Sequence, residues 1–381
     1  MSSEFELLPM PATREHFSLL AVDRVISELR RGRIVAVRGY GGAAVLVQAA
    51  EAITTEGLVE IATMSRGDSR IAITARRAAV LGLRETTAAV VCLTHKKELT
   101  AEAIHELAEP LSASTVKGAD LKIHDAETYA SESAAVALTK LARLLPAAVV
   151  AQPDLEESED LVAWASRHDL LLVDAGDVFQ YERTAARTLR AVSEARVPLL
   201  DAQETKIIAF RPVDGGLEHL AIVIGEPSVD EPVLTRLHSE CFTGDLLGSL
   251  RCDCGDQLRG AIQEIGKTGS GLLLYLAQEG RGIGLVNKLR AYELQDRGFD
   301  TMDANEELGF DADERVYLPA AKMLELLGFN AVRLLTNNPD KVAALSQCGV
   351  KVVDRVSHTF PSNEHNELYL RAKAVKSGHS F

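Results

Sequence analysis

Short apolar runs alternate with helical patterns along most of this chain, and this alternation is the feature that most restricts its fold. Ala147–Ala151 is an apolar run of strand length, Leu161–Arg167 has helical spacing, and Leu170–Asp174 is a second strand-like run. Further along, Gly271–Leu276 is followed by a glycine-rich turn and by the helical pattern Leu285–Arg297. Strands that alternate with helices are typical of layered α/β structures. We therefore predict an α/β fold with mixed (α+β) sheets.

Length and one break in the pattern predict two domains. The chain has 381 residues, which is more than a single hydrophobic core usually serves. The charged segment Glu182–Ala195 has a helical pattern, which ends before Pro198. Beyond this break, Lys206–Phe210 and His219–Ile224 are strand-like runs that we expect to pair. The predicted domains are residues 1–197 and residues 198–381.

Charge and cysteine content restrict the partners and the compartment. The chain carries 41 basic and 55 acidic residues, and its net charge of −14 argues against nucleic acid or an anionic membrane as a partner. No apolar run is long enough to span a membrane, and the acidic start lacks a signal-peptide pattern, so we expect a cytoplasmic protein. Five cysteines do not suggest a disulfide framework there. Cys92 and Cys348 fit small buried hydrophobes.

The other three cysteines, Cys241, Cys252 and Cys254, lie close together in the sequence. Three thiolates can supply the protein ligands of a tetrahedral zinc and leave one position free, as in a catalytic zinc site. A water at that position has its pKa lowered to about 7 and becomes a nucleophile at neutral pH. The same spacing also fits a cysteine-rich loop without metal, or a site completed by His238. Spacing alone leaves these alternatives open.

Two turns that follow apolar runs carry groups suited to phosphate. The turn Gln278–Gly284 is rich in glycine and contains Arg281, and free backbone N–H groups at a helix start bind anions. Thr336 and Lys341 lie around the second turn. Plain strand–helix connections account for both segments equally well.

Four more polar residues have ordinary structural explanations when each is taken alone. Lys288 and Tyr292 are four apart in a helical pattern and fit one solvated face. Asp313 and Arg315 fit a surface loop with a salt bridge. Only their combination with the other motifs points to chemistry.

Taken together, the motifs of residues 200–380 closely resemble GTP cyclohydrolase II. The matching segments, in the family's order, are Arg236–Asp245, Ser249–Gly255, Gln278–Gly284, Asn287–Tyr292, Asp313–Arg315 and Leu335–Pro339. The resemblance implies hydrolytic opening of the imidazole ring of GTP with release of formate and pyrophosphate. The implied product is 2,5-diamino-6-(5-phosphoribosylamino)pyrimidin-4-one, at the first step of riboflavin biosynthesis. Ala277 departs from the family, since many relatives carry arginine there.

The resemblance also implies a role for each matching residue. The three clustered cysteines match the ligands of one Zn²⁺ in the catalytic domain. Asp313 matches the general base, Tyr292 an active-site tyrosine, and Arg315 the residue that engages the α-phosphorus when pyrophosphate leaves. The positions that match GTP-binding residues are Arg236, Leu237, His238, Ser239, Glu240, Gln257, Glu279, Gly280, Arg281, Thr301, Thr336 and Lys341.

The implied reaction begins with attack of a zinc-activated water on carbon 8 of the guanine, and a second hydrolysis releases that carbon as formate. Because a guanidinium is essentially always protonated, we expect Arg315 to stabilise charge on the phosphoryl group rather than to attack it. We expect Mg²⁺ to accompany the triphosphate. GTP as substrate and a second copy of the chain, in a homodimer, are the expected partners.

Residues 15–185 more faintly resemble 3,4-dihydroxy-2-butanone 4-phosphate synthase. The similar segments are Ala21–Val37, Ala50–Thr54 and Leu144–Tyr181. That enzyme binds a divalent metal through an acidic run after its first strand, whereas Arg38–Ala44 contains no carboxylate here. Its Gly-His-Thr-Glu segment corresponds to Ser131–Ser133, which has no histidine. Because metal-assisted enolisation needs such ligands, we expect a folded domain without synthase activity, whose role is dimerisation, stabilisation or regulation.

Two alternatives to this interpretation remain. One is a bifunctional protein that retains synthase activity, and the absence of the acidic run argues against it. The other is a non-catalytic GTP-binding regulator. The complete cysteine trio, together with Asp313, Arg315 and Tyr292, argues against the regulator, because a pure binder has no need of an open zinc site.

Overall fold

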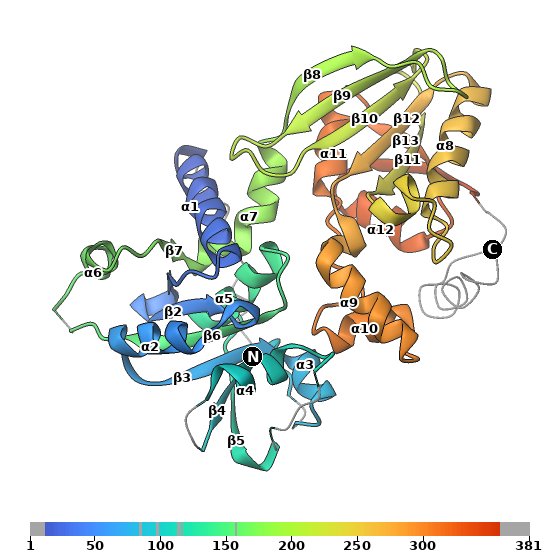
Figure 1. Cartoon of the computed structure of the whole chain (residues 1–381). Coiled ribbons are helices and arrows are strands. Elements are labelled where there is room, and N and C mark those ends of the chain that lie inside the picture. The colour runs from blue at the N-terminus through green and yellow to red at the C-terminus, as the bar shows by residue number, and fades with distance from the viewer. Residues whose placement is uncertain are drawn as a thin grey trace. The chain divides into compact units, whose positions relative to one another are not determined.

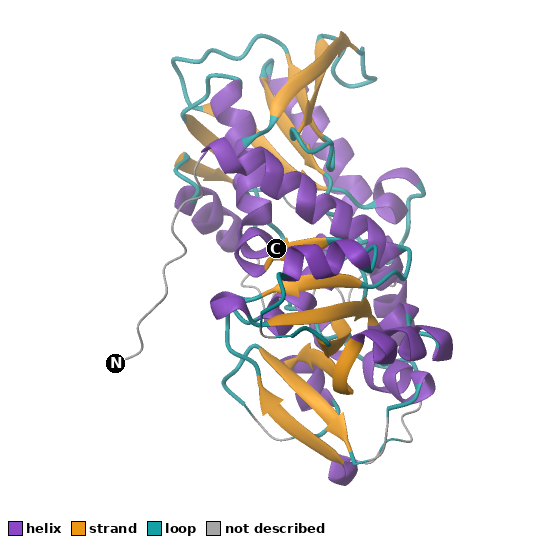
Figure 2. Ribbon diagram, turned by 90° about the vertical axis from the view of Figure 1, so that its left-hand side faces the viewer, coloured by secondary structure: helices purple, strands orange, loops and turns teal. Residues whose placement is uncertain are grey.

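The computed structural model describes residues 12–83, 86–96, 99–112, 116, 118–156 and 158–358, and these residues form two compact units (Figures 1 and 2). The first unit contains the described residues up to Thr184 together with Leu289–Phe299 and Asp303–Asp313. The second contains Ala185–Lys288, Asp300–Met302 and the described residues from Glu314 onward. Each unit is built on one mixed sheet of seven strands, which confirms the predicted fold class. The boundary at residue 198 stays a prediction.

The sheet of the first unit has the strand order β5-β4-β3-β6-β2-β1-β7, and only the pair β1–β7 is parallel. Its strands are β1 (Val35–Arg38), β2 (Ala44–Ala49), β3 (Ser65–Thr74), β4 (Val90–His95), β5 (Leu121–Asp125), β6 (Ala147–Pro153) and β7 (Leu172–Asp174). Its helices are α1 (Ala12–Arg30), α2 (Thr55–Met64), α3 (Ala75–Val80), α4 (Ala101–Ala108), α5 (Ser131–Leu141), α6 (Leu161–Arg167), most of α7 (Ala175–Arg187), the later part of α9 (Leu285–Asp296) and most of α10 (Thr301–Glu307).

Helix α1 shows how the core of the first unit forms. Val22, Val25, Ile26 and Leu29 recur at helical spacing, and each is at most 3% exposed. They pack with α5 and with strands β1, β2 and β6 in one apolar cluster. The apolar face of the helix thus supplies one side of this core.

The second unit has the strand order β14-β13-β11-β12-β10-β9-β8. Its strands are β8 (Arg190–Arg196), β9 (Thr205–Arg211), β10 (His219–Ile224), β11 (Val233–Ser239), β12 (Gly271–Leu276), β13 (Ala331–Leu335) and β14 (Lys351–Val356). Its longer helices are α8 (Cys254–Thr268), α11 (Leu318–Leu326) and α12 (Pro339–Gln347). Strands β12, β11, β13 and β14 run parallel, while β8, β9 and β10 extend the sheet antiparallel.

Strand β12 is buried on both faces, because helices cover the sheet of the second unit on both sides. Leu272, Leu274 and Leu276 share one apolar cluster with residues of α11 and α12. Leu273 belongs to a second cluster, which includes Ala261 and other residues of α8. The alternation follows from the two-residue period of a strand and explains why this segment is a continuous apolar run.

Two expectations about local structure are wrong. The segment Glu182–Ala195 is not one helix: α7 ends at Arg187, and Arg190–Arg196 form strand β8, which pairs with β9. Helix propensity is a weak preference, and the ladder of hydrogen bonds to β9 overrides it here. Cys348 is half-buried at the end of α12 instead of buried, whereas Cys92 is 2% exposed, as expected. Burial raises the pKa of the Cys92 thiol to about 12.

Within the described ranges, none of the helices combines the length and the apolar character that crossing a membrane would require.

Candidate metal centre

The candidate site lies where the parallel strands of the second unit end. Cys241 follows β11, the turn Gln278–Gly282 follows β12, and Thr336 follows β13. Carboxyl ends of parallel strands meet at one edge of a sheet, where α/β proteins commonly place their ligands. This topology gathers motifs that are up to a hundred residues apart in the sequence.

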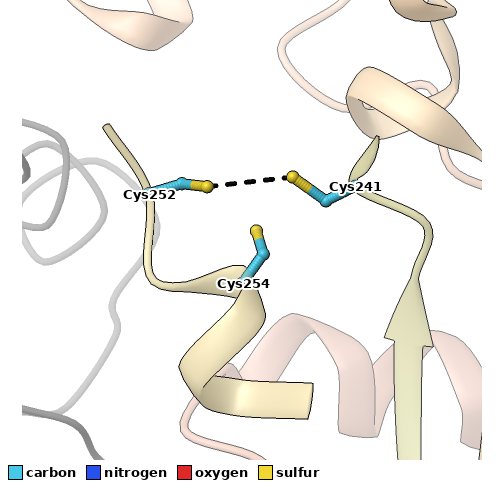
Figure 3. Close-up of side chains that lie close together, drawn as sticks. All are labelled: Cys241, Cys252 and Cys254. Carbon is cyan, nitrogen blue, oxygen red and sulfur yellow. Dashed lines mark hydrogen bonds between the residues drawn. The ribbon is translucent and has the colours of Figure 1, made fainter. Parts of the chain in front are cut away.

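The three clustered cysteines converge in space. Their sulfur atoms all lie within 4.8 Å of one another, and the sulfurs of Cys241 and Cys252 are 3.8 Å apart. Figure 3 shows all three side chains pointing toward a common space. Two sulfurs bound to one tetrahedral zinc, at about 2.3 Å from it, are about 3.8 Å apart. The donor set and its spacing therefore fit zinc.

Gly244 has no side chain, and this leaves room for the three cysteine sulfurs to converge. It belongs to a single π-helical turn, Phe242–Leu246, and is buried. A Cβ at this position would lie 2.8 Å from Cys252 Sγ and 3.1 Å from Cys241 Sγ. Both distances are shorter than a carbon–sulfur contact allows, so the convergence of the sulfurs depends on glycine here.

Contacts among the thiols divide the negative charge unequally. Hydrogen bonds from Cys252 and Cys254, with help from the Lys288 ammonium, lower the pKa of Cys241 strongly. The hydrogen bond to Cys241 raises the pKa of Cys252 to about 11, and the pKa of Cys254 is raised as well. One thiolate is thus stabilised at Cys241, and a thiolate is the form that binds metal.

Lys288 and Glu279 form a buried ion pair beside Cys241. Lys288 Nζ lies 2.9 Å from Glu279 Oε1 and also donates to Cys241 Sγ at 3.1 Å. The other oxygen of Glu279 accepts the Phe242 N–H at 2.6 Å. Lys288 is 9% exposed and Glu279 is 3% exposed. The alternative of a solvated helix face is therefore wrong for Lys288.

Asp245 organises the other side of the Cys241 loop. Its carboxylate accepts the Cys241 N–H at 3.0 Å and the Tyr275 hydroxyl at 2.9 Å, and it hydrogen bonds to His238 Nε2 at 3.0 Å. Burial lowers the pKa of His238, so the imidazole is neutral at neutral pH. His238 thus contacts the cysteine loop through Asp245. The group of potential metal ligands found among the described residues consists of the three cysteines.

Arg236 is the centre of a second buried network. Its guanidinium donates to Gln257 Oε1 and, at 2.9 Å, to the Leu335 carbonyl. Gln257 Nε2 donates to Asp253, and the Gln257 carbonyl lies 3.0 Å from His358 Nε2. Burial lowers the pKa of Arg236 to about 10, with Arg315 adding to this effect through its positive charge. Arg236 Nε is buried and has no hydrogen-bond partner within the described part of the chain.

Several other expected GTP contacts lie on the same strand ends. Lys341 Nζ donates to the Leu237 carbonyl at 3.0 Å, while the Leu237 side chain lies in the core. Ser239 Oγ accepts from Gln278 Nε2 at 3.0 Å. Glu240 extends the ladder through its N–H to the Leu276 carbonyl, and Thr336 is buried after β13.

The turn after β12 has an unusual backbone. Gly280 and Arg281 both have φ near +60°, a conformation that disfavours arginine. The Arg281 carbonyl accepts the Glu314 N–H at 3.1 Å, which fixes the start of the segment that leads to Arg315. The Arg315 guanidinium carbon lies 6.0 Å from the ring centre of Tyr317. Strain of this kind is commonly kept at functional sites.

Three expected residues lie on other segments of the chain. Tyr292 on α9 and Asp313 after α10 belong to stretches of the first unit, and their roles stay predictions. Thr301 begins α10, but its side chain lies outside the described residues.

Sequence reasoning assigned no role to Asp245, Asp253, Tyr275 or His358. Asp245 hydrogen bonds to Cys241, Tyr275 hydrogen bonds to Asp245, and both Asp253 and His358 hydrogen bond to Gln257. Asp253 stands between two clustered cysteines, and Asp245 is four residues after the third, so proximity in the sequence is a usable signal for these two. Tyr275 and His358 are brought in by other strands. No local pattern could have identified them.

Several known proteins are similar to this chain. The family model for GTP cyclohydrolase II matches residues 190–357. A protein named GTP cyclohydrolase-2 from Azospirillum brasilense is 54% identical over 98% of this chain and 96% of its own. Riboflavin biosynthesis protein RibBA from Bacillus cereus is 37% identical, covering 94% of this chain and 98% of its own. A solved structure of RibBX, described as a two-domain 3,4-dihydroxy-2-butanone 4-phosphate synthase from A. baumannii, covers 83% of this chain and 93% of its own at 17% identity, with a TM-score of 0.35.

Proposed function

This chain belongs to the GTP cyclohydrolase II family, and we propose that its second unit uses zinc to open the imidazole ring of GTP, releasing formate and pyrophosphate. The product would be 2,5-diamino-6-(5-phosphoribosylamino)pyrimidin-4-one, an intermediate of riboflavin biosynthesis. The observation that carries the proposal is the convergence of three cysteine sulfurs at the carboxyl edge of the sheet. A trio of thiolates leaves a fourth position of a tetrahedral metal for water or substrate.

Cys241, Cys252 and Cys254 would hold the metal. Zinc held there would lower the pKa of a water ligand and so supply a nucleophile at neutral pH. Gly244 leaves room for the three sulfurs, and Asp245 fixes the backbone of Cys241. These residues supply the rigid support that a catalytic centre needs.

Arg236 and Lys341 are the cations best placed to receive the anionic substrate. Both are buried, Arg236 within β11 and Lys341 in α12, and Arg236 keeps one buried N–H without a partner in the described ranges. A buried donor of this kind is satisfied by a ligand oxygen or by water. The set of GTP contacts predicted from the family resemblance, with Mg²⁺ on the triphosphate, is proposed on the same basis.

Asp313, Tyr292 and Arg315 are the proposed catalytic side chains. Asp313 would accept a proton from the attacking water. Arg315, whose charge acts on buried Arg236, would stabilise the phosphoryl group as pyrophosphate leaves. Tyr292 would hydrogen bond in the active site.

Formate and pyrophosphate release from GTP, measured together with the zinc content of the purified chain, tests the proposal. We expect one zinc per chain, formate release that stops when a chelator removes zinc, and recovery when zinc is returned. Cys252→Ser should lose both zinc and formate release while the first unit stays folded. Stoichiometric zinc and tight GTP binding without formate would instead support the non-catalytic regulator.

We further propose that the first unit lacks butanone-phosphate synthase activity. Two residues at the corresponding positions form ion pairs with other parts of the unit: Arg38 donates two hydrogen bonds to Asp174, at 2.6 and 3.0 Å, and Glu132 accepts one from Arg70 at 3.1 Å. Incubation with ribulose 5-phosphate and Mg²⁺ should yield no butanone phosphate. Product formation would establish the bifunctional alternative instead.

A homodimer and a cytoplasmic location complete the proposal. Both follow from the family resemblance and the composition. Light scattering of the purified chain tests the dimer, which should have about twice the mass of one chain.

A further inference from the structure

Lys288 lies against the proposed metal ligands, where neither the sequence motifs nor the comparisons give it a role. Its Nζ is 3.1 Å from Cys241 Sγ, 3.0 Å from Thr243 Oγ1 and 2.9 Å from Glu279 Oε1. An ammonium group has three donors, and each of these contacts has hydrogen-bond geometry. One of them therefore points at a metal-binding sulfur.

The ammonium is held in this position by its surroundings. One carboxylate oxygen of Glu279 accepts a hydrogen bond from Lys288. The other accepts the N–H of Phe242, the residue after Cys241. Gly280 allows the close approach, because a Cβ there would lie 3.2 Å from Lys288 Cβ and its φ is +65°. If the Lys288 side chain, 11% exposed, turned to solvent, the buried Glu279 carboxylate would lose its ion-pair partner.

The contact between Lys288 and Cys241 matters because the proposed zinc–thiolate group carries a net charge. Three thiolates and one Zn²⁺ leave a net charge of −1, and an unbalanced buried charge is unfavourable. The Lys288 ammonium places a positive charge next to the Cys241 sulfur, although the carboxylate of Glu279, its ion-pair partner, keeps the sum over the whole group at −1. An N–H donor to a bound sulfur also orients it, as partners of metal ligands commonly do.

We propose that Lys288 is a positioning residue of the metal centre, which orients the Cys241 sulfur and sets the affinity for zinc. This inference rests on the proposed function, because it requires that the cysteines bind zinc. A purely structural Lys288–Glu279 ion pair would support the fold but would not act on the sulfur.

The test compares zinc affinity and ligand geometry in full-length variants. Lys288→Met keeps most of the side-chain volume and removes the charge, and Lys288→Arg keeps the charge. Lys206→Met is the control, because Lys206 makes an exposed ion pair with Glu194 far from any cysteine in the sequence. Competition with a chromophoric chelator gives the zinc affinity, and the sulfur-to-cobalt charge-transfer band of the Co²⁺-substituted chain reports the state of the sulfurs.

We expect Lys288→Met to weaken zinc binding about 10- to 100-fold and to shift the cobalt band, with Lys288→Arg between it and the parent. The double variant Glu279→Gln/Lys288→Met removes the carboxylate left unpaired by the single change. It should fold like the parent, with the affinity still lowered.

Different results overturn different claims. If the parent chain holds no zinc, the metal centre fails and this inference fails with it. If the parent binds zinc and a folded Lys288→Met or double variant shows the same affinity and cobalt band, the role of Lys288 is refuted while the proposed function stands.

Discussion

At the scale of single residues, Gly244 has the most direct effect on the cysteine group. We expect Gly244→Ala to lower zinc content and formate release at least about tenfold, because the added Cβ would lie 2.8 Å from Cys252 Sγ. Metal analysis and the formate assay measure both effects. Gly176→Ala is the matched control: Gly176 is exposed in α7 and a Cβ there meets nothing within 4 Å. Normal zinc content in Gly244→Ala would contradict the crowding argument.

His358 makes the stability of the fold depend on pH. Burial lowers the pKa of His358 to about 4 from an ordinary value of 6.5, so the folded chain binds this proton less readily than the unfolded chain. The stabilisation is complete above pH 6.5 and is lost as the pH falls toward 4. By linkage, the parent should lose about 2–3 kcal/mol more than His358→Gln over this interval. Urea unfolding of both proteins at several pH values measures the difference, and parallel curves would disprove it.

Residue identity predicted the cysteine trio but not its support. The spacing of Cys241, Cys252 and Cys254 left a metal site and a metal-free loop open, and the structure brings the three sulfurs within 4.8 Å of one another. Lys288 looked like part of a solvated helix face, because its burial depends on Glu279, which reaches it from the turn after another strand. Local pattern cannot reveal a partner that only the tertiary structure supplies.

At the scale of elements, patterns with an apolar period were reliable and a charged segment was not. Gly271–Leu276 and Leu161–Arg167 are found within the predicted bounds. Strand β8 is exposed along its whole length, so no buried face marks it in the sequence. Its alanines and charged residues favour a helix, and pairing with β9 decides the outcome.

The turn after α10 gives a prediction at this scale. Gly309 has φ +85°, and a Cβ there would meet Thr74 Oγ1 at 2.9 Å and Pro146 Cγ at 3.0 Å. Thr74 also donates to the Gly309 carbonyl at 2.7 Å. Gly309→Ala should lower the free energy of unfolding by roughly 2–4 kcal/mol, because backbone strain and overpacking add.

Comparison with Gly298→Ala separates the cost of backbone strain from the cost of overpacking. Gly298 follows α9 and has φ +102°, but a Cβ there meets nothing within 4 Å. This variant should therefore show backbone strain alone, about 1–2 kcal/mol. Urea unfolding of both variants measures the difference, and equal losses would refute a tight contact at Gly309.

At the scale of the whole molecule, the units are not continuous in the sequence. Leu289–Phe299 and Asp303–Asp313 lie within the predicted second domain but belong to the first unit. There, Arg76 binds Glu306 at 2.9 Å and Asp311 at 2.7 Å, and Arg290 binds Glu109 at 2.9 Å. The sequence suggested one break near residue 198, because periodicity identifies elements but not which core they join.

This arrangement predicts the behaviour of a fragment of residues 198–381. Leu294, Leu308 and Phe310 are at most 2% exposed in the whole chain, and the fragment lacks most of the unit to which they belong. We expect it to retain part of the formate release but to self-associate and melt at a lower temperature than the parent. Light scattering and thermal unfolding measure this. The fragment 188–381, which keeps β8, isolates the contribution of that strand.

A fragment of 198–381 that is monomeric and as stable as the parent would show that residues 289–313 need no support from the first unit.

The shared segment also affects how the polypeptide is made. Domains commonly fold in order as they emerge during synthesis. Here the first unit lacks part of its own structure until residue 313 has been translated, by which time the cysteine loop has already left the ribosome. The first unit therefore stays incomplete while the metal ligands emerge from the ribosome. Both units complete their folding near the end of translation.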